Sequence, residues 1–200
     1  NSRSFWLRAL TISAMTSGEK VSYEGRFFKV SNFKLLNALA RKNVPVYVAA
    51  VNRNMVSLAC ELADGILLYL RPVDELKATV AKIRRATEGR NFEVALSLIC
   101  AVSDSEPEKA RERAAKTLAF YVATGKYYNR FLAENGFAEE VERIAAEYRR
   151  NGGDAAGRQV PEEMLDSLAV CGTRKKCKKA LERFTGAGVT LPILQLNPVE

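Results

Sequence analysis

Residues 43–70 read NVPVYVAAVNRNMVSLACELADGILLYL, and the pattern of this stretch decides the fold. An apolar run at 44–50 leads into a polar turn at 52–54, and a break at 64–65 precedes a second apolar run at 66–70. Between the turn and the break, apolar side chains recur at helical spacing at Met55, Leu58, Ala59 and Leu62. Two short apolar runs joined by a helix predict a βαβ unit whose strands are both buried in a parallel sheet.

The turn after the first apolar run would lie where ligands bind, because the carboxyl ends of parallel strands form the ligand face of such folds. We therefore expect this turn to hold a phosphate or another part of a cofactor. Its residues are Ala50, Val51, Asn52 and Arg53. Arg71 follows the second apolar run and would reach the same face, where it would either contact an anionic group or form a surface salt bridge.

The composition is that of an ordinary globular protein. The chain has 200 residues, of which 48% are hydrophobic and 27% are charged, enough for one sizeable core or two small ones. No apolar run approaches the roughly 20 residues that a membrane span requires, and no secretory segment is visible, so we expect a cytoplasmic protein. The chain opens NSRSFWLRAL, a helix-like pattern without an initiator Met, which indicates a fragment, a processed product or a truncated gene.

The net charge of +8 does not by itself indicate an anionic partner. Acidic and basic residues are interleaved in EPEKARERAAK and EEVERIAAEYRR, which is typical of solvated helix faces and would suit a thermophile. A denser basic cluster at 174–179 leaves nucleic-acid binding open as an alternative, although no recognised module spacing supports it.

The chain contains no histidine, which constrains its chemistry. Ser-His-Asp and Cys-His nucleophile systems and His-ligated metal sites are excluded. The four cysteines show no CxxC spacing, so we expect buried thiols in a reducing compartment and no metal site. They are Cys60, Cys100, Cys171 and Cys177.

The rest of the chain is expected to alternate between helices and strands. A hairpin is predicted at 21–30, and Asp104–Ser105 and Gly152–Gly157 are predicted as a helix cap and a flexible break. Further helices are predicted at 3–17, 72–87, 106–123, 125–135, 137–151, 161–169 and 172–187, and further strands at 92–102 and 189–196. Four buried strands with intervening helices predict one α/β domain over 1–200 with a parallel sheet and a helical insertion at about 125–169.

Three blocks resemble one family. VSYEGRFFKV, VPVYVAAVNRNMVSLACELADGILL and VCGTRKKCKKALERFTGAGVTLPIL are similar to the bacterial-luciferase-like flavin and deazaflavin oxidoreductases, above all to the methylenetetrahydromethanopterin reductase branch. The resemblance implies a (β/α)8 TIM barrel, of which this chain would be the C-terminal half, with the fifth to eighth strands. Half a barrel leaves open sheet edges, so we expect either a missing N-terminal half or a homo-oligomer.

The resemblance also implies a phosphate site. The family turn reads Ala-Ala-x-Gly-Pro, and its amides receive the cofactor phosphate at the start of a helix. Here Asn52 stands at the position of Gly and Arg53 at that of Pro; Asn tolerates the left-handed conformation, and Arg adds a charged donor. A purely structural turn is the alternative.

The implied activity is hydride transfer between coenzyme F420 and a small substrate such as a methylene-tetrahydropterin. The alternatives are an FMN-dependent luciferase-like monooxygenase and a non-catalytic flavin-binding paralogue. Three tyrosines at 121, 127 and 128 would stack on a ligand ring or pack between helices, and Gln195 and Asn197 would bond a ligand or simply end the last strand. No catalytic residue is assigned.

Overall fold

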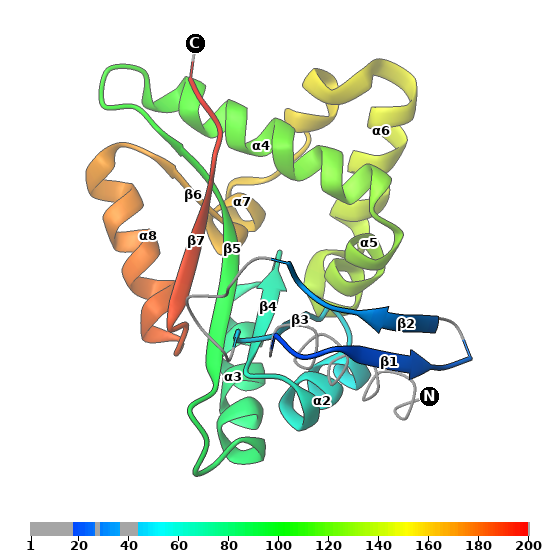
Figure 1. Ribbon diagram of the computed structural model, residues 1–200. Coiled ribbons are helices and arrows are strands. Elements are labelled where there is room, and N and C mark those ends of the chain that lie inside the picture. Colours follow the sequence, from blue (N-terminus) through cyan, green and yellow to red (C-terminus); the bar gives the residue numbers. More distant parts are fainter. Residues whose placement is uncertain (1–17, 27–28, 37–43, 200) are drawn as a thin grey trace.

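The computed structural model describes residues 18–26, 29–36 and 44–199 (Figure 1). The helix predicted at 3–17 lies outside the described residues. The hairpin is confirmed: β1 (Val21–Glu24) pairs antiparallel with β2 (Lys29–Phe33), with Tyr23 opposite Val30.

The predicted βαβ unit is confirmed. It consists of β3 (Tyr47–Ala49), α2 (Arg53–Leu62) and β4 (Gly65–Tyr69), and the two strands are parallel with Val48 opposite Ile66. The unit forms because Val48, Ile66 and the helix residue Ala59 are all buried in one apolar cluster. The parallel α/β fold class follows from this pairing and from the strands that continue the sheet.

The remaining strands gather around β5 (Glu93–Val102), which is parallel to all of its neighbours. Its residues 93–97 pair with β4, 99–102 pair with β6 (Ala169–Gly172), and 95–100 pair with β7 (Leu191–Leu196). Because β7 overlaps both other registers, β4 and β6 share one edge of β5 and β7 takes the other. The described sheet therefore has five strands, where the sequence predicted four. The additional strand is β6: the helices predicted at 161–169 and 172–187 left only Val170 and Cys171 between them. Its four residues follow α7 without a turn.

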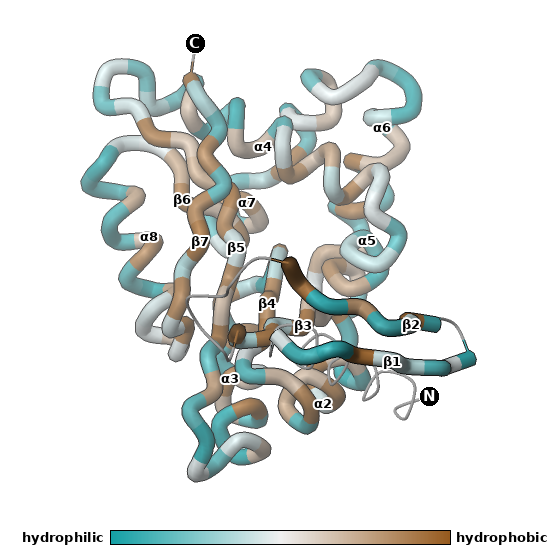
Figure 2. The backbone as a smooth tube through the Cα atoms, viewed as in Figure 1, coloured by the Kyte–Doolittle hydropathy of each residue, from teal (hydrophilic) through white to brown (hydrophobic). Residues whose placement is uncertain are grey.

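Helices cover both faces of the sheet. On one face lie α2, α3 (Val73–Ala86) and α8 (Arg174–Gly186). On the other lie α4 (Pro107–Thr124), α5 (Lys126–Leu132), the π-helical turn η1 (Ala133–Phe137), α6 (Ala138–Gly157) and α7 (Glu162–Leu168). Strand β5 serves both cores, since Leu96 and Leu98 point to the first and Ile99 and Ala101 to the second. In Figure 2 the hydrophobic colour follows the strands at the centre.

Two local predictions were wrong. The residue that caps α4 is Glu106, whose N–H donates to Ser103 Oγ at 3.0 Å, while Asp104 instead accepts from the Arg174 N–H at 2.8 Å. The segment 152–157 is not a flexible break, because α6 continues through it with a single kink at Gly152 (φ 80°). Packing explains the second case: a Cβ on Gly157 would lie 3.1 Å from the Lys116 Cα, so glycine permits α6 to approach α4 closely.

The two ends of the sheet are open among the described residues, since β3 pairs only with β4 and β7 only with β5. Strand β7 leaves large apolar side chains exposed at Leu191, Ile193, Leu194 and Leu196. The homo-oligomer and the missing N-terminal half stay predictions. None of the helices in the described ranges is long and apolar enough to cross a membrane.

Candidate functional site

The turn after β3 leads directly into the first turn of α2. The Ala50 N–H donates to the Leu67 carbonyl at 3.1 Å, which extends the parallel ladder beyond the strand. Asn52 then caps the helix, with its Oδ1 accepting from the Met55 N–H at 3.0 Å. Its φ of −93° is extended, so the left-handed conformation considered for this position is not used. The amides of Arg53 and Asn54 are the other donors of this turn, and no acidic residue stands beside them in it.

Arg71 is buried, with 3% of its surface exposed, and it is not the surface salt bridge of the sequence-based alternative. Its Nη2 donates to the Val51 carbonyl at 2.6 Å, and its Nη1 donates to Glu75 Oε1 at 2.6 Å. The Thr79 hydroxyl donates to the same Glu75 oxygen at 2.5 Å. The arginine therefore ties the turn after β3 to helix α3 through charge-assisted hydrogen bonds.

Two polar atoms in this group, Arg71 Nε and Glu75 Oε2, are buried and have no hydrogen-bond partner among the described residues. The face of the guanidinium lies over the Phe131 ring of α5, 4.6 Å from its centroid. Leu70, directly before the arginine, has a φ of 49° although it is 1% exposed and not glycine. Backbone strain and unsatisfied buried donors concentrate at functional sites, so both observations single out this corner of the fold.

The Asp64–Gly65 pair has a structural role. Asp64 Oδ2 accepts from the Val46 N–H at 2.8 Å, and the Asp64 N–H donates to the Val46 carbonyl at 2.9 Å. A Cβ on Gly65 would lie 2.5 Å from the Tyr47 ring and 3.0 Å from the Glu93 carbonyl oxygen. Glycine is therefore required for β3, β4 and β5 to lie together at this level.

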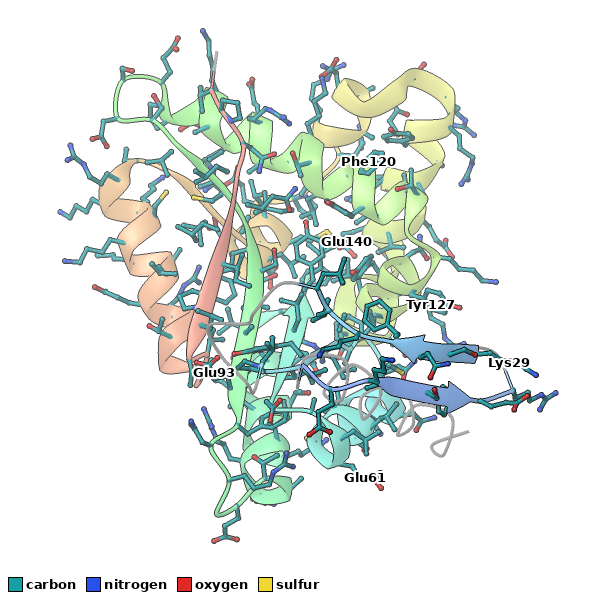
Figure 3. All side chains as sticks on the ribbon, in the orientation of Figure 1. Lys29, Glu61, Glu93, Phe120, Tyr127 and Glu140 are labelled. Atoms are coloured by element: carbon teal, nitrogen blue, oxygen red, sulfur yellow. The ribbon has the colours of Figure 1, made fainter. Side chains whose placement is uncertain are left out.

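Aromatic side chains fill the space between β4 and α4. Tyr69 meets Tyr121 and Tyr128 edge to face, with ring centroids 5.0 and 5.5 Å apart. The Tyr69 hydroxyl donates to Gln195 Oε1 at 2.6 Å, and burial raises the pKa of this phenol. Tyr127 does not take part; it is 72% exposed on α5 (Figure 3). Packing rather than an open stacking surface therefore accounts for Tyr121 and Tyr128.

The structure brings some of the predicted site residues together. Val51 and Arg71 are hydrogen-bonded, Ala50 and Asn52 shape the turn between β3 and α2, and Arg53 is exposed at its tip. Sequence reasoning missed Glu75, although its i,i+4 spacing from Arg71 is a usable signal. It also missed Phe131, whose ring lies 4.6 Å from the Arg71 guanidinium but far from it along the chain, so that no sequence pattern links the two residues.

All four cysteines are buried free thiols, as predicted. Burial raises the pKa of Cys171 to about 12 and the pKa of Cys177 to about 11. In the described part of the chain, no group of three or more Cys, Asp or Glu side chains is placed to hold a metal ion.

The raised pKa of Cys171 makes stability depend on alkaline pH. Its thiol stays protonated in the folded state while the unfolded thiol ionises near pH 9, so the stability is full below about pH 9 and is lost as the pH rises toward 12. We expect the urea midpoint to fall between about pH 9 and pH 11, and to fall less steeply in Cys171→Ala. Equal slopes in the two proteins would contradict the assignment to this thiol.

Proteins of similar sequence form a consistent group. The pattern of the family described as luciferase-like monooxygenase matches residues 6–191. The chain is 28% identical over 188 residues to the 5,10-methylenetetrahydromethanopterin reductase of Archaeoglobus fulgidus, covering 90% of this chain and 55% of that protein. It is 27% identical over 186 residues to the reductase of the same name from Methanolobus tindarius, covering 90% and 56%. The chain thus spans about half the length of the curated relatives it matches.

Solved structures share the fold. The coenzyme F420 dependent tetrahydromethanopterin reductase from Methanopyrus kandleri superposes with a TM-score of 0.76 at 24% identity, covering 93% of this chain and 55% of that one. An F420-dependent secondary alcohol dehydrogenase gives a TM-score of 0.65 at 17% identity, covering 97% and 56%. Coverage of about half agrees with a partial barrel, and the resemblance to the methylenetetrahydromethanopterin reductases is confirmed. The match over residues 6–191 establishes that the chain belongs to the luciferase-like monooxygenase family.

Proposed function

We propose that this chain is the cofactor-holding part of an oxidoreductase that transfers hydride between coenzyme F420 and a small substrate such as a methylene-tetrahydropterin. The names of the relatives from Archaeoglobus fulgidus and Methanolobus tindarius support the reaction class. The observation that supports the proposal in this chain is the turn between β3 and α2, which begins a helix without an acidic residue in its first turn and whose Val51 carbonyl is held by Arg71.

The residues of this turn fit a phosphate group. The amides of Arg53 and Asn54, which have no acceptor within the helix, begin a helix of ten residues, where the helix dipole favours negative charge. The exposed Arg53 side chain adds a second donor, and the buried Arg71 holds the Val51 carbonyl of the turn. Ala50, Val51, Asn52 and Arg53 would therefore hold the cofactor phosphate, and Arg71 would support the turn that they form.

The protein's own contribution is orientation. When bound, the deazaflavin ring supplies the hydride-carrying chemistry, which needs no histidine from the chain. Arg71 holds the Val51 carbonyl at 2.6 Å and so fixes the turn against α3 before any ligand arrives. The Tyr69, Tyr121 and Tyr128 rings pack against one another next to β4 and would limit the access of water to that side of the strand ends.

A fluorescence titration of the purified chain with coenzyme F420, and separately with FMN, tests the proposal. We expect saturable binding of F420 and weaker or no binding of FMN. Saturation by FMN alone would replace the proposal with the FMN-dependent monooxygenase, since that cofactor also presents a phosphate. Binding of neither would show that these five residues do not form a working site in this chain.

A further inference from the structure

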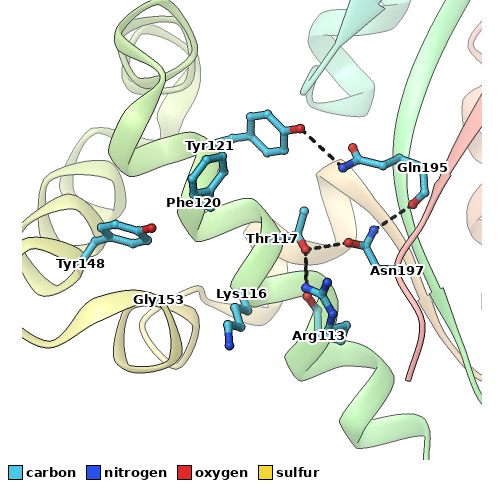
Figure 4. A pocket seen from close by; sticks show the side chains of 9 residues that line it. All are labelled: Arg113, Lys116, Thr117, Phe120, Tyr121, Tyr148, Gly153, Gln195 and Asn197. Atoms are coloured by element: carbon cyan, nitrogen blue, oxygen red, sulfur yellow. Dashed lines mark hydrogen bonds between the residues drawn. The ribbon is translucent and has the colours of Figure 1, made fainter. Parts of the chain in front are cut away.

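A hollow lies across helix α4, between α6 and the end of β7 (Figure 4). Its volume is about 320 Å³, which is at the lower end of the range for small-molecule sites and would hold one or two fused rings. None of the residues lining it belongs to the turn at 50–53 or to the Arg71 group, so the hollow is separate from the proposed phosphate site, although it shares Tyr121 with the aromatic group beside β4.

Helical spacing places the polar, cationic and aromatic side chains of α4 that line the hollow on one side of the helix. Arg113, Lys116, Thr117 and Phe120 follow one another at i, i+3, i+4 and i+7, so their side chains share a face. Two of the nine residues that line the hollow are cations and none is acidic. The hollow therefore combines positive charge with aromatic surface.

The aromatic part consists of Phe120, Tyr121 and Tyr148. The Phe120 ring centroid lies 5.4 Å from that of Tyr121 and 6.3 Å from that of Tyr148, and both pairs meet edge to face. Phe120 is nevertheless 47% exposed, and its ring is one of the three aromatic rings that line the hollow (Figure 4). An aromatic ring is the ligand group that would cover it most favourably.

The cations keep donors for an anion. Arg113 uses Nη1 to reach Thr117 Oγ1 at 2.9 Å, and a guanidinium has five N–H groups. Lys116 Nζ pairs with Asp154 Oδ1 at 2.6 Å, but the Asp154 side chain is 72% exposed. Such an exposed pair contributes little and leaves the ammonium able to meet a ligand.

The opposite wall is formed by the polar residues Gln195 and Asn197, whose side chains are already hydrogen-bonded within the protein. Asn197 is 8% exposed; its Oδ1 accepts from the Thr117 hydroxyl at 2.8 Å, and its Nδ2 donates to the Gln195 carbonyl at 2.8 Å. Gln195 Oε1 is taken by the Tyr69 hydroxyl. This wall therefore gives the hollow a fixed shape. The aromatic rings and the cations on the other side would decide which ligand binds.

We propose that this hollow binds a planar aromatic ring that carries a negatively charged group, with the ring against Phe120 and Tyr148 and the charge against Arg113 and Lys116. A flat acid such as 2-naphthoate has the required chemistry. The neutral 2-naphthylmethanol keeps the ring without the charge, and cyclohexanecarboxylate keeps the charge without the aromatic ring.

Gly153 offers a variant that fills the hollow. A Cβ there would lie 3.5 Å from the Tyr148 ring and 3.8 Å from the Lys116 side chain, in ordinary contact and without a backbone penalty. Gly153→Leu would therefore occupy the space beside Phe120. Gly186→Leu, on the exposed end of α8 with no atom within 4 Å of its Cβ, is the matched control.

Calorimetric titration with the three compounds tests the proposal. We expect 2-naphthoate to bind at least tenfold more tightly than either analogue, Gly153→Leu to weaken it at least tenfold, and Gly186→Leu to leave it unchanged. Arg113→Gln, measured in parallel in case Gly153→Leu does not fold, should weaken 2-naphthoate but not 2-naphthylmethanol. Equal affinity for the three compounds, no detectable binding of 2-naphthoate, or unchanged 2-naphthoate binding by both Gly153→Leu and Arg113→Gln would overturn the proposal. F420 titration of the same variants keeps this result separate from the proposed function.

Discussion

Replacing Arg71 with Met is expected to lower the free energy of unfolding by about 3–5 kcal/mol, because it leaves the Glu75 carboxylate without its cation in a place largely removed from water. The Glu75 side chain is 21% exposed, and its buried Oε2 has no hydrogen-bond partner in the part of the chain that the structure describes. The change also releases the Val51 carbonyl, so the turn after β3 loses its support. Urea denaturation followed by circular dichroism measures the loss.

Arg111→Met is the matched control. Arg111 is also buried, at 7% exposed, and pairs with Glu162 and Asp166. Those carboxylates are 77% and 54% exposed, so they return to water when the arginine is removed, and we expect a loss of only about 1 kcal/mol. Adding Glu75→Gln to Arg71→Met should recover part of the larger loss, since no buried charge is then left unpaired. Equal losses in the two single variants would contradict the argument.

Asn52→Asp should separate cofactor binding from stability. Aspartate caps a helix as well as asparagine does, and its charge suits the helix N-terminus, so the unfolding midpoint should stay or rise. The new carboxylate would, however, face the proposed phosphate. Two like charges about 4 Å apart repel by roughly 4 kcal/mol at an effective dielectric constant of 20, so we expect at least about tenfold weaker F420 binding. The fluorescence titration and a thermal melt of the same sample measure both.

Asn52→Ala should give the reverse pattern. It removes the acceptor of the Met55 N–H, which costs about 0.5–2 kcal/mol of stability, but introduces no repulsion. If Asn52→Asp and Asn52→Ala weaken F420 binding equally, the turn does not meet the phosphate. In that case the cofactor must be held elsewhere, and the capped turn is purely structural.

The elements that could be predicted from the sequence are those whose pattern is local. The runs at 44–50 and 66–70 and the apolar helix face between them specify the βαβ unit without help from the rest of the chain. Strand β6 could not be found in this way, since it becomes a strand only by lying against residues 99–102 of β5. Likewise, 153–157 is helical because it packs on α4, which no local glycine rule reports.

In the candidate site, too, local patterns predict some features and tertiary packing determines the others. The position of Ala50–Arg53 at a strand end follows from the βαβ pattern, and Arg71 follows from the end of the next run. That Arg71 is buried under Phe131 follows only from the way α5 crosses the strand ends. The partners of a buried charge are a property of tertiary packing, and only the i,i+4 partner Glu75 was within reach of the sequence.

The sharing of β5 between two cores limits how this gene can change in evolution. Successive residues such as Leu98 and Ile99 face opposite layers. Deleting or inserting one residue within 93–102 would therefore turn each later side chain of the strand from one core to the other. The same change would shift the strand against three neighbours at once. We therefore expect length variation among descendants of this chain to accumulate in loops such as the one after α3, while β5 keeps a fixed length and changes only by substitution.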